Sequence, residues 1–211
     1  MSTVVVYVHG LWLNGWESVL LRRRLSRQLH CRTLSFAYSS ARADMATNVR
    51  SLAQFLAGIG ADTLHLVGHS MGGLVILELF DLESRPPLPP GRVVLLGSPV
   101  QGSLAARNLA RRPVGKRLLG LSGREALPVS RERRWRGFRD LGVIAGDVPL
   151  GFGRLVGPFR EPNDGTVLLA ETRLAGAAQH LTLHTSHSAL VYSGVAARQT
   201  AAFLRNGRFA D

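Results

Sequence analysis

Six short apolar runs recur along the chain, separated by longer segments of mixed polarity. Each run is rich in Val, Leu and Ile and largely lacks the alternation of apolar and polar positions that marks a half-exposed strand. Strands buried on both faces, as in a parallel sheet, have this character. The predicted strands are Thr3 to Val8, Cys31 to Phe36, Thr63 to Val67, Arg92 to Leu96, Leu141 to Ala145 and His180 to Leu183.

The segments between these runs show helical spacing. In the second interval, Met45, Val49, Leu52 and Leu56 share one helical face. A repeating order of strand and helix implies right-handed crossovers and a mostly parallel sheet with helices on both faces. A chain of 211 residues is long enough for one well-buried domain and short for two, so we expect a single α/β domain over residues 1–211.

Polar residues gather just after the predicted strands. In parallel α/β sheets the ligand site lies outside the carboxyl ends of the strands. The residues that follow the strands are His9-Gly10-Leu11-Trp12, Ser70, Gly97-Ser98-Pro99, Asp147 and then Asn163-Asp164-Gly165, and His184 to Ser188. A serine, an acid and a histidine therefore come in that order, each on the carboxyl side of a strand.

The pentad Gly68-His69-Ser70-Met71-Gly72 lies between a predicted strand and a predicted helix over Met71 to Ser84. This setting predicts a tight turn that raises the serine hydroxyl at its apex. Glycines suit positions 68 and 72 because a Cβ at either would collide across the turn. An ordinary helix N-cap serine is the simpler interpretation, but the downstream acid and histidine favour Ser70 as a nucleophile.

A serine nucleophile needs a base within hydrogen-bond reach and an acid that orients the base. His187 is preferred to His184 as the base, because a histidine in the loop after the last strand can lean over the sheet toward the serine. Two carboxylates compete for the third role. Asp147 directly follows its strand, whereas Asp164 lies in an Asn-Asp-Gly turn, and the residue spacing barely separates them.

The reaction of such a serine passes through a tetrahedral intermediate, which needs two preformed backbone donors. The amide of Met71, at a helix N-terminus, is one candidate. The second is the amide of Leu11, because Gly10 lets the loop after the first strand turn that amide inward.

The chain is strongly basic, with a formal net charge of +12 and a pI near 11.5. Lys116 is the sole lysine, which indicates a coding bias toward arginine more than a selected phosphate-binding surface. Residues 100–139 hold eleven basic and two acidic residues, with leucines among the arginines. We expect this segment to form a short helical cap over the strand ends, with peripheral contact to an anionic membrane as an added property and no specific nucleic-acid partner.

The composition also excludes several kinds of site and segment. Cys31 is the sole cysteine, so the chain can form neither an internal disulfide nor a thiolate metal cluster, and we expect no metal and no cofactor. No apolar stretch approaches the roughly 20 residues of a membrane span. The first predicted strand begins at Thr3 and leaves no room for a cleavable signal segment, so we expect a cytoplasmic protein.

As a set, the motifs resemble those of the α/β-hydrolase superfamily, and within it small bacterial lipase- and esterase-like hydrolases, such as the deacylase that remodels lipid anchors. The likeness is carried by His9-Gly10-Leu11, the serine pentad with Gly73, Gly97-Ser98-Pro99 with Gln101-Gly102-Ser103, Asn163-Asp164-Gly165-Thr166-Val167 and Ser186-His187-Ser188. It implies that Asp164, and not Asp147, is the acid, that His187 is the base and that Leu11 supplies the first oxyanion amide.

Some features depart from the larger members of that superfamily. Their two leading antiparallel strands have no counterpart here, because the first predicted strand directly precedes His9. The cap is only about 40 residues long, which implies a more open site than that of an interfacial lipase. Val100 and Gln101 stand where many relatives carry Pro-His.

The resulting hypothesis is a serine hydrolase that cleaves carboxylic esters through an acyl-enzyme, with Trp12, Leu13 and His69 as substrate-binding residues. Apolar neighbours of the serine favour an acyl chain or lipid as substrate. The alternative is an acyltransferase with the same triad and an alcohol or amine acceptor. The remaining hypothesis, a non-enzymatic binder of nucleic acid or anionic lipid, predicts affinity that falls with salt and does not depend on Ser70. The oligomeric state stays open.

Overall fold

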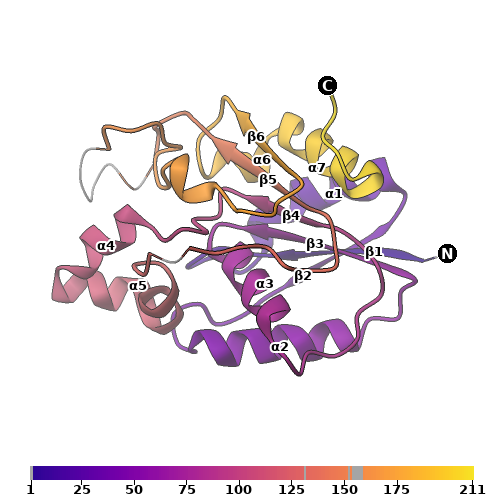
Figure 1. Cartoon of the computed structure of the whole chain (residues 1–211), viewed down its shortest axis with the longest axis horizontal. Helices are drawn as coiled ribbons and strands as arrows, with labels where there is room; N and C mark the ends of the chain where they lie inside the picture. Colours follow the sequence, from indigo (N-terminus) through magenta and orange to yellow (C-terminus); the bar gives the residue numbers. More distant parts are fainter. Residues whose placement is uncertain (1, 131, 152, 154–158) are drawn as a thin grey trace.

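The computed structural model describes residues 2–130, 132–151, 153 and 159–211. Its centre is a six-stranded sheet in the order β2-β1-β3-β4-β5-β6, in which all neighbouring strands are parallel (Figure 1). The strands are β1 Thr3–Val8, β2 Arg32–Phe36, β3 Thr63–His69, β4 Val93–Leu96, β5 Leu141–Gly146 and β6 Gln179–Leu183. The predicted strands and the α/β fold class are confirmed, with every strand end within two residues of the prediction.

Burial of the strands follows the sequence pattern. The inner strands β1, β3, β4 and β5 are buried along nearly their whole length, whereas the edge strands β2 and β6 are mostly half-buried. After β2 the chain crosses back over β1 to begin β3, and it then adds β4, β5 and β6 in one direction. The carboxyl ends of β1 and β3 therefore flank a topological switch point, where sheets of this type bind their ligands.

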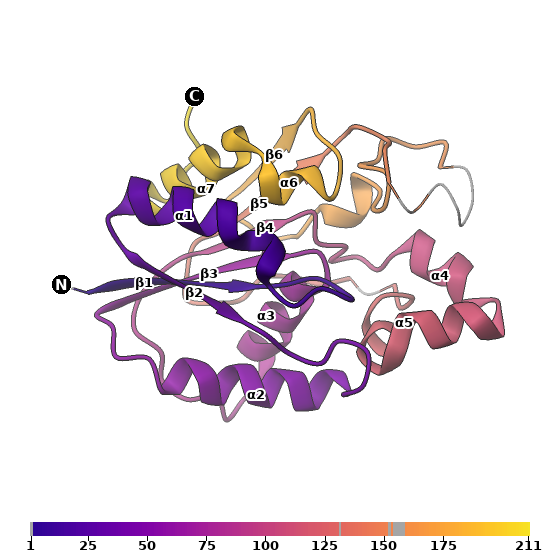
Figure 2. The ribbon, with the colours of Figure 1, turned by 180° about the vertical axis from the view of Figure 1, so that it is seen from behind.

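Helices cover both faces of the sheet (Figures 1 and 2). One face carries α1 Val19–Leu29 with the short η1 Trp16–Ser18, α6 Ala189–Tyr192 and α7 Gly194–Asn206, and the other carries α2 Met45–Ala57 and α3 Met71–Asp81. Helix α3 ends three residues before the predicted Ser84, because Leu82 adopts an extended conformation. None of the described helices is long and apolar enough to cross a membrane.

The arginine-rich segment forms two helices at the carboxyl ends of the strands (Figure 1). They are α4 Leu104–Ala110 and α5 Pro113–Ala126, and α5 is kinked at Gly120, where φ is +65°. The chain then returns along the α3 side to β5, and Trp135 packs edge-on against Phe80 with ring centroids 5.0 Å apart. Arg131, which belongs to the same segment, lies outside the described residues.

Hydrogen bonds fix the second half of α5 to the loop that precedes α2. The Ser122 hydroxyl donates to the Ala43 carbonyl (2.6 Å) and accepts from the Asn48 side-chain amide (2.7 Å). The Leu121 amide donates to the Ala41 carbonyl at 2.9 Å. The cap is thus anchored to the body of the domain over the site described next.

Candidate active site

Ser70 lies at the apex of the turn between β3 and α3. Its φ of +52° and ψ of −124° are a strained conformation for a residue with a side chain. The Ser70 amide donates to the Leu96 carbonyl at 2.9 Å, which holds the turn against β4. The strand, turn and helix that the pentad predicts are therefore present.

The glycines around Ser70 permit close approaches of the backbone. A Cβ added at Gly68 would lie 2.7 Å from Gly73 Cα, so this position collides across the turn as expected. A Cβ at Gly72 would instead lie 2.1 Å from the carbonyl oxygen of Val8, at the end of β1. Gly72 thus lets α3 rest directly on the neighbouring strand.

His187 and Asp164 form a buried pair beside Ser70. His187 Nδ1 lies 2.7 Å from Asp164 Oδ2, and the two side chains are only 8% and 1% exposed. The other carboxylate oxygen, Oδ1, accepts from the amides of Thr166 (3.0 Å) and Val167 (2.8 Å). The His187 amide also donates to the Asp164 carbonyl at 2.8 Å. Backbone donors therefore fix both members of the pair.

The alternative acid and the alternative base pair with each other. His184 Nδ1 lies 3.0 Å from Asp147 Oδ1, in an exposed position. The structure therefore brings Asp164, and not Asp147, to His187, which agrees with the assignment that the resemblance implies.

The loop after β1 passes close to the serine. Gly10 approaches Ser70 so closely that an added Cβ would lie 3.1 Å from the Ser70 Cβ. Among the described residues, the amides of Leu11 and Met71 have no hydrogen-bond acceptor. Both amides are thus free to donate to a ligand at this site.

His9 holds this loop in place. The Tyr38 amide donates to His9 Nε2 at 3.1 Å, so the ring proton resides on Nδ1, which donates to the Gly10 carbonyl at 2.7 Å. The Tyr38 hydroxyl donates to the His9 carbonyl at 2.9 Å, and the two rings stack. Burial lowers the pKa of His9, which favours this neutral form. Because a trans peptide points its C=O and N–H in opposite directions, fixing the Gly10 carbonyl also fixes the Leu11 amide.

His69 lies beneath the catalytic candidates. Its ring is almost fully buried and packs at 4.9 Å from the ring of His187, and its Nε2 lies 3.3 Å from the His187 carbonyl. Burial, together with the nearby His187, lowers the pKa of His69 to about 3. The ring is therefore neutral at physiological pH and supports the backbone of His187.

An apolar pocket of about 340 Å³ opens over Ser70 and His187. Trp12, Leu13 and His69, the predicted substrate-binding residues, all line it. The cap contributes further lining residues, which are Ala105, Ala106, Leu109, Leu119 and Leu127. The described lining residues include no Asp, Glu, Lys or Arg, and no metal-binding cluster of His, Cys, Asp and Glu occurs in the described part of the chain.

Glu171, in η3 Ala170–Thr172, is a supporting residue that the sequence did not reveal. Its carboxylate accepts from the Leu104 amide at 2.5 Å and from the Leu168 amide at 3.0 Å, so it joins the start of α4 to the loop of Asp164. Burial raises its pKa. These partners lie far away in the chain or in irregular loops, where no periodic pattern indicates a contact.

Solved structures with a similar fold include several hydrolases, all at low sequence identity. The type II thioesterase BorB from the borrelidin biosynthetic cluster is 15% identical over 97% of this chain and 92% of its own, with a TM-score of 0.66. The lin2722 gene product of Listeria innocua is 14% identical over 100% of this chain and 96% of its own (TM-score 0.64). The carboxylesterase CesB (YbfK) of Bacillus subtilis is 14% identical over 98% and 84% (TM-score 0.58).

A search of curated proteins finds no significant match. A family model, described as the alpha/beta hydrolase family, matches residues 5–206, nearly the whole chain. The fold, the serine turn and this match lead to one conclusion: the chain belongs to the alpha/beta hydrolase family.

Proposed function

We propose that the protein is a serine hydrolase that cleaves carboxylic esters. Ser70 is the nucleophile, His187 is the general base and acid, and Asp164 orients His187. The amides of Leu11 and Met71 stabilise the oxyanion. The observation that carries this proposal is the buried His187–Asp164 pair at 2.7 Å, which lies in one apolar pocket with a serine on a strained strand-to-helix turn.

The hydrogen bond to Asp164 places the ring proton of His187 on Nδ1, which leaves Nε2 free to accept the Ser70 proton. The Ser70 hydroxyl makes no hydrogen bond with a described residue, and catalytic pairs of this kind often tighten only when substrate binds. Attack of Ser70 Oγ on the acyl carbon gives a tetrahedral oxyanion. His187 then protonates the departing alcohol, and water, activated by the same ring, hydrolyses the acyl-enzyme.

The pocket favours an uncharged acyl group. Its described lining includes no charged carboxylate, lysine or arginine side chain, so a charged acyl group would lose its hydration without a partner. A volume of about 340 Å³ lies near the lower end of the range of about 300–1,000 Å³ for small-molecule sites. We therefore expect short to medium acyl chains to be the best substrates.

The decisive experiment compares Ser70→Ala with Ser188→Ala. Both serines line the pocket, but only Ser70 lies on the strained turn. Ser70→Ala should abolish both hydrolysis of p-nitrophenyl butyrate and labelling by a fluorophosphonate probe, while Ser188→Ala should keep both within a few fold. Turnover or labelling that survives in Ser70→Ala would refute the proposed triad.

The released product tests hydrolysis against acyl transfer. Hydrolysis predicts that free butyrate remains the main product when a primary alcohol is added as a competing acceptor. A new butyrate ester as the main product would make the enzyme an acyltransferase with the same nucleophile.

A further inference from the structure

Exposed apolar side chains lie on the loop after β1 and on the cap helix α5, two segments that also contribute residues to the lining of the active-site pocket. Trp12 and Leu13 come from the loop after β1, and the Trp12 indole N–H donates to the Leu118 carbonyl of α5 at 2.6 Å. This bond places the loop directly beside the cap helix. We call the exposed apolar set the docking face, and its members are Trp12, Leu13, Val114, Leu118 and Leu121.

The cap helix has an unusual distribution of apolar residues. Val114 and Leu118, four positions apart on the first half of α5, are 71% and 46% exposed. The other side of α5, including Leu119 and Gly123, is buried against the domain. The solvent-facing side of a helix is ordinarily polar. Exposed apolar residues on that side of α5 therefore indicate that it contacts another apolar surface.

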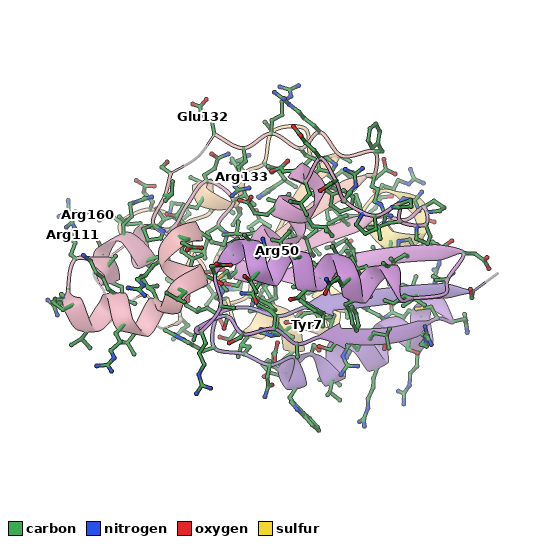
Figure 3. All side chains as sticks on the ribbon, turned by 90° about the horizontal axis from the view of Figure 1, so that it is seen from below. Tyr7, Arg50, Arg111, Glu132, Arg133 and Arg160 are labelled. Carbon is green, nitrogen blue, oxygen red and sulfur yellow. The ribbon has the colours of Figure 1, made fainter. Side chains whose placement is uncertain are left out.

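Unpaired positive charge surrounds the docking face. Arg111, Arg112, Lys116 and Arg117 are all exposed, and none has an ion-pair partner among the described residues. The only acid in α4 and α5 is Glu125, whose carboxylate accepts from the Met45 amide at 3.0 Å. Arg111 and Arg160 extend from the same outer end of the molecule (Figure 3). The exposed side of the first half of α5 and the segment that precedes it are therefore both apolar and cationic.

We propose that the docking face binds an anionic lipid surface, with Val114, Leu118 and Trp12 inserted at the headgroup level and the surrounding cations paired with lipid phosphates. Amphipathic helices that lie in a membrane interface combine an apolar side with flanking Lys and Arg in this way. Protein interfaces are depleted of lysine and have few charged residues at their buried core, although arginine is enriched in them. Binding to the lipid surface does not require ester hydrolysis. That it would deliver a lipid acyl ester to the pocket rests on the proposed function.

The test measures sedimentation of the full-length protein with vesicles. The protein should bind phosphatidylglycerol vesicles, bind phosphatidylcholine vesicles far more weakly, and dissociate as the salt concentration rises. Each cation near an anionic surface is expected to strengthen binding on the order of fivefold. Lys116→Gln/Arg117→Gln should therefore weaken binding on the order of 20-fold, and Val114→Asp about tenfold.

Matched variants control for net charge and for loss of an apolar side chain. Arg23→Gln/Arg27→Gln removes two exposed charges from α1, and Val195→Asp changes an exposed valine on α7. Both should bind like the wild type, and so should Ser70→Ala, which separates docking from catalysis. The proposal is overturned if no vesicles are bound, if the two lipids bind equally, or if the α1 and α7 variants weaken binding as much as the docking-face variants.

Discussion

Two histidine–aspartate pairs lie close together in the chain. Each joins an acid that follows β5 to a histidine that follows β6, and the ring-to-carboxylate distances are similar, 2.7 Å for His187–Asp164 and 3.0 Å for His184–Asp147. Their surroundings differ. The side chains of His184 and Asp147 are 87% and 38% exposed, whereas those of His187 and Asp164 are almost fully buried.

In the proposed function only the His187–Asp164 pair is the catalytic dyad, and the comparison indicates which structural features set it apart. Two backbone amides hold one oxygen of Asp164, so its other oxygen has a fixed direction toward His187. Asp147 receives no such backbone donors in the described structure, and water competes for both partners of the exposed pair. Burial and backbone support therefore distinguish the pair that can orient a base from the pair that lies on the surface.

The largest expected effect comes from neutralising each acid in turn. Asp164→Asn should lower kcat for p-nitrophenyl butyrate by about 10⁴-fold, because an amide no longer fixes the required tautomer of His187. Asp147→Asn should change kcat less than about twofold, the effect of a surface substitution. Comparable losses in the two variants would show that the exposed pair takes part in catalysis.

Buried histidines should also make stability depend on pH. Burial lowers the pKa of His65 to about 4 and that of His69 to about 3. Below about pH 6.5 the unfolded chain binds protons at these two histidines, while the folded chain does not. The contribution of the two neutral histidines to the free energy of unfolding is therefore fully present above about pH 6.5 and is lost as the pH drops toward 4. The expected loss in the free energy of unfolding is about 3 kcal/mol per histidine.

Urea unfolding at a series of pH values measures this loss. His65→Gln should flatten the pH dependence between about pH 6.5 and 4, whatever its effect on stability at neutral pH. An unchanged slope in this variant would show that burial of His65 does not govern acid stability.

A smaller effect is expected from His9, a buried histidine that acts on the site without contacting substrate. His9→Phe removes the hydrogen bond to the Gly10 carbonyl. It should lower kcat on the order of 10–100-fold with little change in KM, because in the proposed function the Leu11 amide stabilises only the transition state. Tyr38→Phe, which loses only the hydroxyl bond to the His9 carbonyl, should have a milder effect. Steady-state kinetics of both variants would contradict this role if KM, and not kcat, changed.

The smallest effect concerns the exposed pair itself. A double-mutant cycle with His184→Ala and Asp147→Ala should give a coupling energy of about 0.2–1 kcal/mol in urea unfolding, the range that exposed, solvent-screened pairs of side chains give. High salt should reduce this coupling. A coupling above about 2 kcal/mol that persists in high salt would indicate that the pair is shielded from solvent in solution.

The fold could be predicted from the sequence because its strands are buried on both faces. Val4–Val8 and Val93–Leu96 each present an uninterrupted apolar run that only a doubly covered strand can accommodate. The serine turn was equally visible, because the glycines on both sides of Ser70 mark a sharp turn, although only Gly68 is required by an approach within the turn, while Gly72 is required by its approach to β1.

The acid could not be assigned from spacing, because Asp147 also stands at a strand end. What brings Asp164 beneath His187 is its turn, in which Gly165 has a φ of +91° and the following amides point at the carboxylate. The sequence did not predict the supporting roles of Tyr38 and Glu171, because their partners lie far away in the chain. The contact between Glu171 and Leu104 spans 67 residues, and the contact between Tyr38 and His9 spans 29.

Gly72 has a consequence for engineering this protein. Because α3 rests on the carbonyl of Val8 through Gly72, the turn that carries Ser70 and the end of β1 that leads into the Leu11 loop are in direct backbone contact. Grafting a foreign loop after β1 would have to reproduce that backbone contact to keep the positions of the two proposed oxyanion donors, the amides of Leu11 and Met71, unchanged relative to each other. Residues of the cap, such as Ala105 and Leu109, face the pocket without this constraint. Libraries that aim to change the accepted acyl group should therefore vary the cap and leave the loop after β1 untouched.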